Sequence, residues 1–82
     1  MSKREIIVEE DWLYTLYKKE DDYYLSAVCG TIAVFTVTVQ LAEDEKKIFE
    51  EQGEPYIKRM AYAIINSPNS FEKRSVQLPS DD

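Results

Sequence analysis

A stretch of alternating side chains constrains the fold more than any other feature of this chain. Between Ile32 and Leu41, apolar side chains at every second position share one face, and the other face carries threonines, glutamine and branched residues. Side chains of a β-strand alternate between the two faces of a sheet, so this stretch predicts a half-buried strand. The row expected to face the core is Ala33, Phe35, Val37, Val39 and Leu41.

Two further strands are predicted before this one. Residues 12–17 are rich in aromatic and branched side chains, and residues 23–29 lead to Gly30, where a positive φ would let the chain reverse. The three strands are expected to form an antiparallel meander. Trp12 and Tyr14 are expected to cover the sheet.

The side-chain period changes to a helical one after the third strand. Three acids at 43–45 suit the N-terminus of a helix, and Gly53 is a typical stop, which predicts a helix over 43–52. A second helix is predicted over 55–66. The two segments stay nearly in phase, so one helix kinked at Gly53 is the alternative. The core positions of the second helix are Ile57, Met60, Ala61 and Ile64.

These elements predict one small α+β domain over residues 1–82, with the helices packed on one face of the sheet. The strands carry apolar side chains on both faces, so one helical layer leaves the other face uncovered. Residues 67–82 are expected to be a partly flexible tail anchored by Phe71, with 79–82 disordered.

Charge and composition favour binding over catalysis. The chain has 16 acidic and 10 basic residues, no histidine and a net charge of −6. It therefore lacks the commonest proton shuttle, and its surface attracts cations and repels phosphate backbones. Its lysines and arginines are scattered doublets beside acids, which argues against nucleic-acid binding. We expect no enzymatic activity and no cofactor.

The sequence also constrains disulfide bonds, metal sites and the cellular location of the protein. Cys29 is the only cysteine, which excludes an internal disulfide, and its place in a strand predicts a buried, inert thiol. Neither Asp21–Asp22 nor the acids at 43–45 have the spacing of a calcium loop, so no metal is expected. The absence of a secretory signal pattern or an uninterrupted apolar span predicts a soluble, cytoplasmic protein that does not enter membranes.

The acidic residues lie near aromatic ones, a combination that is typical of protein interfaces. They form either a docking surface for a basic protein partner or a solvated face that favours solubility. Tyr23 and Tyr24 point to opposite faces of the predicted strand, so at most one belongs to the core. The predicted partner-binding residues are Glu20, Asp21, Asp22, Tyr23, Tyr24, Glu10 and Asp11.

The run from Asp22 to Leu41, the acidic helix, Gly53, the second helix and the segment 71–74 together resemble small bacterial immunity proteins of polymorphic toxin systems. The likeness covers about residues 12–74 as a pattern of elements, without a catalytic or ligand motif. It implies a protein that binds and neutralises a cognate toxin, often a basic nuclease blocked by acidic residues. No role of an individual residue is carried over.

The uncovered sheet face supports a hypothesis of another class. A structural or regulatory homo-oligomer, such as a homodimer, would pair this face with its own copy, because an exposed apolar patch is unusual on a monomer. The candidate self-interface residues are Val28, Val34, Thr36 and Thr38, together with Tyr24.

Overall fold

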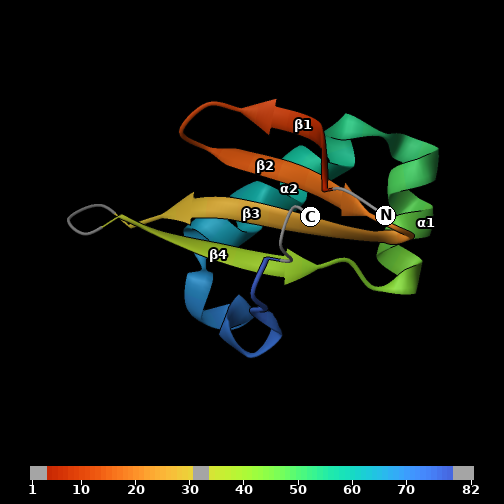
Figure 1. The fold of residues 1–82 in the computed structure, drawn as a ribbon. Helices are drawn as coiled ribbons and strands as arrows, with labels where there is room; N and C mark the ends of the chain where they lie inside the picture. The colour runs from red at the N-terminus through yellow and green to blue at the C-terminus, as the bar shows by residue number, and fades with distance from the viewer. Residues whose placement is uncertain (1–3, 31–33, 79–82) are drawn as a thin grey trace.

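The computed structural model describes residues 4–30 and 34–78 and has an α+β architecture. An antiparallel sheet of four strands has the order β1-β2-β3-β4, and the helices lie behind one of its faces (Figure 1). The strands are β1 (Glu5–Glu10), β2 (Tyr14–Lys19), β3 (Asp22–Cys29) and β4 (Phe35–Gln40). They are followed by α1 (Glu43–Gln52), α2 (Glu54–Asn66) and the 3-10 helix η1 (Pro68–Arg74).

The prediction of three strands is wrong, because β1 adds a fourth at the edge of the sheet. Its pairing with β2 shifts register between Ile6 and Val8, so an extra residue, Ile7, forms a bulge. The bulge interrupts the alternation, and every residue of β1 except Val8 is exposed, which explains why no strand pattern is visible. The predicted strand 12–17 is β2, two residues further along the chain.

The core lies between the inner face of the sheet and α2. Leu16, Leu25 and Val39 have no exposed surface, and α2 buries its residues at the predicted three- and four-residue spacing. Phe35 departs from the prediction: it shares the inner face with Val37, but it is 48% exposed. It lies at the start of β4, where the sheet extends past α2 (Figure 1). Ala33 lies outside the described residues.

The region 43–66 forms two helices rather than one kinked helix. Gly53 separates them with a φ of 77° and a ψ of −151°, a conformation that few residues with a side chain adopt. Its N–H donates to the Phe49 carbonyl at 2.7 Å, which ends α1. The bounds of α1 agree with the prediction, and α2 begins one residue earlier than predicted.

The C-terminal segment returns along β4. Ser75 forms an isolated antiparallel bridge with Val39, and the Val76 N–H donates to the Thr38 carbonyl at 2.8 Å. Phe71 packs against the core, as predicted. Residues 79–82, for which disorder is expected, lie outside the described part of the chain.

Candidate functional site

The turn between β1 and β2 holds the most unusual residue of the structure. A hydrogen bond of 3.0 Å from the Leu13 N–H to the Glu10 carbonyl closes this turn, Asp11–Leu13, which we call the Trp12 turn. Trp12 is 89% exposed and has a φ of 67°. That region disfavours residues with a bulky side chain by about 1 to 2 kcal/mol. The structure therefore holds a large aromatic ring in water on a strained backbone, contrary to the prediction that Trp12 covers the sheet.

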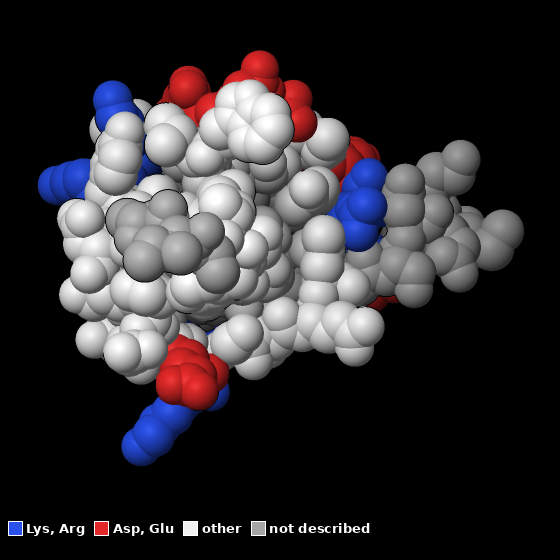
Figure 2. Space-filling view, turned by 90° about the vertical axis from the view of Figure 1, so that its left-hand side faces the viewer, with Lys and Arg blue, Asp and Glu red and all other residues white. Residues whose placement is uncertain are grey.

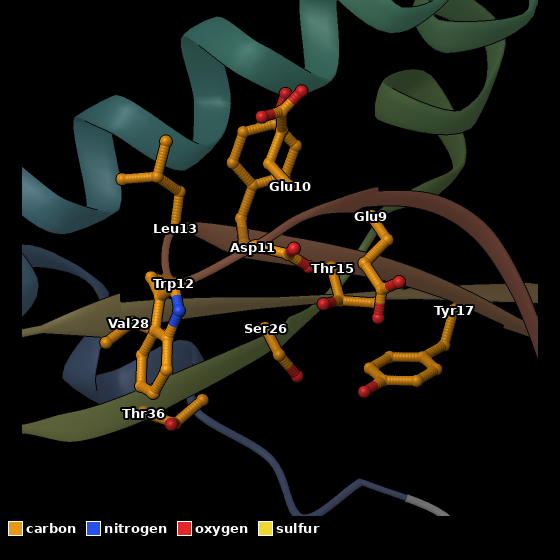
Figure 3. Close-up of a pocket in the computed structure, with 11 residues that line it drawn as sticks. Glu9, Glu10, Asp11, Trp12, Leu13, Thr15, Tyr17, Ser26, Val28 and Thr36 are labelled. Atoms are coloured by element: carbon orange, nitrogen blue, oxygen red, sulfur yellow. The ribbon is translucent and has the colours of Figure 1, made fainter.

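A shallow hollow of about 230 Å³ lies beside Trp12 on the sheet face that the helices leave uncovered. Figure 3 shows the indole ring beside Val28 and Thr36, with the carboxylates of Glu9 and Asp11 near Thr15. The floor of the hollow combines apolar and hydroxyl side chains, and acids form one rim. Such a surface accepts the apolar stem and the charged end of a lysine or arginine side chain.

Glu10 points to the other side of the sheet from Glu9. In Figure 3 its carboxylate points toward the helices, and its register partner on β2 is Tyr14. Burial raises the pKa of the Tyr14 hydroxyl, and the negative charges of Glu10 and Glu54 raise it further. The Trp12 turn therefore carries negative charge on both sides. Figure 2 shows this end of the molecule, with acidic residues along its upper border.

The second predicted acidic surface lies at the opposite end of β2. Register pairing of Lys19 with Asp22 leaves a loop of Glu20 and Asp21, in which Glu20 has a φ of 59°. We call residues Glu20–Asp22 the hairpin tip. The length of β2, about 20 Å at the usual rise per residue, separates the hairpin tip from Glu10 and Asp11. The structure therefore divides the predicted partner-binding residues between two ends of the sheet.

The hairpin tip has more cationic neighbours than the Trp12 turn. Asp22 lies 4.0 Å from the ammonium group of Lys46 on α1. Asp21 shares a surface hollow with Lys18, Lys46 and Lys47. Glu43 and Glu50 line the same hollow, and Glu43 lies 3.3 Å from the Lys46 ammonium group, so the surroundings of the hairpin tip carry mixed charge. The charged residues that line the Trp12 hollow are all acidic.

Tyr23 and Tyr24 lie on opposite faces of β3, as predicted. Tyr23 packs edge-on against Phe49 of α1, with ring centres 5.3 Å apart. Tyr24 lies on the uncovered face opposite Tyr17, and burial, with Asp22 and Glu20 as smaller causes, raises its pKa. Tyr23 thus supports the helix, and Tyr24 belongs to the uncovered face.

The predicted self-interface residues differ in what they expose. Val34 is 71% exposed and Thr36 is also exposed, whereas Val28 is half-buried beside the Trp12 hollow. Thr38 is only 8% exposed, and its hydroxyl lies 2.8 Å from that of Ser26 in a hydrogen bond. Thr38 therefore offers little surface to a second copy.

Cys29 is buried, and burial raises the pKa of its thiol, which disfavours the reactive thiolate. In the ranges 4–30 and 34–78, no three or more cysteine and carboxylate side chains converge as a metal site would require. None of the helices described has the length and apolar character needed to cross a bilayer.

The residue that sequence reasoning placed wrongly is Trp12. Three consecutive acids, Glu9 to Asp11, directly precede it, and such a run is better suited to a turn than to the start of a covered strand. In comparisons with known proteins, no family model, no curated protein and no solved structure matches this chain.

Proposed function

We propose that this protein is a small non-enzymatic module that binds and inhibits a basic protein, in the manner of the immunity proteins its sequence resembles. The observation that supports this proposal is Trp12, which is 89% exposed at a positive φ beside Glu9, Glu10 and Asp11. Tryptophan is among the residues that contribute most to binding energy at protein interfaces. Strained backbone conformations also concentrate at functional sites.

The negative charge of the surface determines which kind of protein it attracts. A net charge of −6, with acids on both sides of the Trp12 turn, attracts a cationic protein and speeds its association. At an ionic strength of about 0.1 M, salt largely screens the attraction between exposed charges that are more than about 10 Å apart. The association rate constant should therefore fall as salt is added, while the contribution of Trp12 persists.

Affinity capture from the source cell, with matched variants as bait, tests the proposal. Proteins retained by the natural chain and by Phe35→Ala, but lost from Trp12→Ala, are candidate partners. Phe35 is the control because it is a second exposed aromatic, 48% exposed, in a different part of the sheet. With the purified partner, Trp12→Ala should weaken Kd by at least about 30-fold, or about 2 kcal/mol.

The two acidic ends provide a matched pair for charge reversal. Changing Glu9, Glu10 and Asp11 to lysine should slow association more than the same change at Glu20, Asp21 and Asp22. A larger effect at the hairpin tip would move the docking surface to that end. Unchanged affinity in Trp12→Ala and in both charge reversals would refute the proposed function.

A homo-oligomer is the second candidate, and the uncovered sheet face with Val34 at 71% exposure favours it. An interface of that kind persists at high salt, because burial of apolar surface does not depend on charge. Sedimentation at low and high salt should then show a dimer that Val34→Glu converts to a folded monomer. A natural chain that is monomeric at both salt concentrations contradicts this candidate.

A further inference from the structure

The outer edge of β1, on the side away from β2, has backbone groups available for pairing. Within residues 4–30 and 34–78, β2 is the only strand neighbour of β1. Figure 1 shows β1 along one border of the sheet, with the turn at its end leading into β2. An edge strand carries a row of N–H and C=O groups that can pair with another chain. We call this border the open edge.

The side chains of β1 leave the open edge accessible. Ile6 is 56% exposed and Ile7 is 40% exposed, and Glu5, Glu9 and Glu10 are exposed as well. By contrast, β2 has no exposed residue. An apolar and acidic strand of this kind offers apolar contact and negative charge to whatever pairs with it.

The bulge and the Trp12 turn determine where pairing is regular. The register shift lies between Ile6 and Val8, so the regular part of the strand is Val8–Glu10, which runs directly into the Trp12 turn. A bulge disturbs edge pairing locally. A strand added beside Val8–Glu10 would run toward the Trp12 turn, whose indole lies over the other side of β2, beside Val28 and Thr36.

Charge decides which occupant fits the open edge. In the centred antiparallel register, a second copy of β1 would place Glu5 opposite Glu10, and each copy carries a net charge of −6. Like charges directly opposite each other destabilise a strand pair. A foreign segment with lysine or arginine at alternate positions would instead place cations beside the acids. The open edge therefore favours a basic partner over a second copy.

We propose that the partner adds an extended basic segment to the open edge of β1 as a fifth strand. This inference rests on the proposed function and specifies how the partner binds. Strand addition takes affinity from main-chain hydrogen bonds and specificity from alternate side chains. It predicts a binding energy that depends on the backbone N–H groups of the partner.

A blocked peptide of alternating lysine and valine, about ten residues long, is the probe. We expect the peptide to slow exchange of amide hydrogens in β1 by about tenfold at saturation, and not to slow exchange in the hairpin tip. The same peptide with glutamate in place of lysine should not bind. Absence of binding by the lysine peptide, or protection confined to the hairpin tip, would overturn the inference.

Backbone methylation separates strand addition from attraction between side chains. A second peptide of the same sequence is N-methylated at every valine and every lysine, so neither of its edges can donate backbone hydrogen bonds. Strand addition predicts that it binds at least about tenfold more weakly than the unmodified peptide. Equal affinities for the two would contradict the inference.

Failure of the inference and failure of the proposed function give different results. If Trp12→Ala weakens binding of the natural partner while the methylated and unmodified peptides bind equally, the module binds a basic protein without strand addition. If neither Trp12→Ala nor charge reversal at the Trp12 turn affects the natural partner, the proposed function itself is wrong.

Discussion

Strands β4 and β1 form the two edges of one sheet, yet only β4 has a further segment bonded along it within the described residues. Ser75 bridges Val39, and the Val76 N–H donates to the Thr38 carbonyl. Strand β4 has three buried residues in succession, whereas β1 has none. The chain uses its own C-terminal segment to cover part of one edge and leaves the other accessible to the strand addition proposed above.

One arginine links the segment that covers β4 to the rest of the fold. The Arg74 guanidinium binds the Glu45 carboxylate at 2.5 and 3.0 Å and donates to the Gln40 carbonyl at 3.3 Å. Glu45 also accepts a 2.7 Å hydrogen bond from the Ala42 N–H at the start of α1. Arg74 therefore joins η1 to α1 and β4.

The same substitution on each edge strand should have unequal effects on stability. Val39→Ala removes two methyl groups from a site with no exposed surface and should lower the free energy of unfolding by about 2 kcal/mol. Val8→Ala, at a half-buried site on β1, should cost less than about 1 kcal/mol. Urea denaturation of both variants measures the difference. Equal losses would show that the two edges contribute alike.

Breaking the Arg74 contact should loosen the covered edge. Arg74→Gln should lower the free energy of unfolding by about 1 kcal/mol, because the pair is bidentate but its arginine is 39% exposed and so partly screened. Amide exchange at Val76 should quicken, and exchange in β1 should stay unchanged. A double-mutant cycle with Glu45→Gln isolates the pair, and a coupling energy near zero would contradict this account.

The Trp12 turn should become more stable when Trp12 is replaced by glycine, which has no Cβ atom. Trp12→Gly relieves the positive φ and should raise the free energy of unfolding by up to about 1 kcal/mol. Trp12→Ala retains the Cβ and should not give this gain. A thermal midpoint that rises for glycine but not for alanine supports the interpretation that stability is sacrificed here for binding, and a loss in both would refute it.

Alkaline pH should destabilise the protein through Tyr14, with almost no effect at neutral pH. Burial, Glu10 and Glu54 raise the Tyr14 pKa above its ordinary value of 10.0, so the folded state keeps a proton that the unfolded state loses. Stability is then fully present below pH 10 and falls as pH rises through the folded pKa. Tyr14→Phe should therefore lose less stability than the natural chain between pH 9 and pH 11. A parallel decline in both proteins would exclude Tyr14 as the cause.

The parts of the fold that depend on local pattern could be predicted from the sequence. Strand β3, the inner row of β4 from Val37 onward and both helices follow from side-chain period and from Gly53, which fixes the boundary between α1 and α2. These patterns depend only on residues that lie close together in the sequence. For this reason the α+β class and the packing of the helices on one face were predictable.

The parts that depend on distant contacts could not be predicted. Arg74 and Glu45 are 29 residues apart, and neither shows in the sequence that it has a partner. Strand β1 is exposed and bulged, so it lacks the buried alternation by which strands are recognised. Of the candidate site, the sequence drew attention to Glu10 and Asp11, but Trp12 was expected to cover the sheet and its exposed ring was missed.

Trp12 has a spectroscopic consequence, because it is the only tryptophan of the chain. Its indole is already 89% in contact with water in the native state, so unfolding should shift its emission little. Contact with a partner would place the ring in an apolar environment and shift the emission toward the blue. Intrinsic fluorescence would then report complex formation, and circular dichroism would report folding, so the two events could be followed separately without attaching a label.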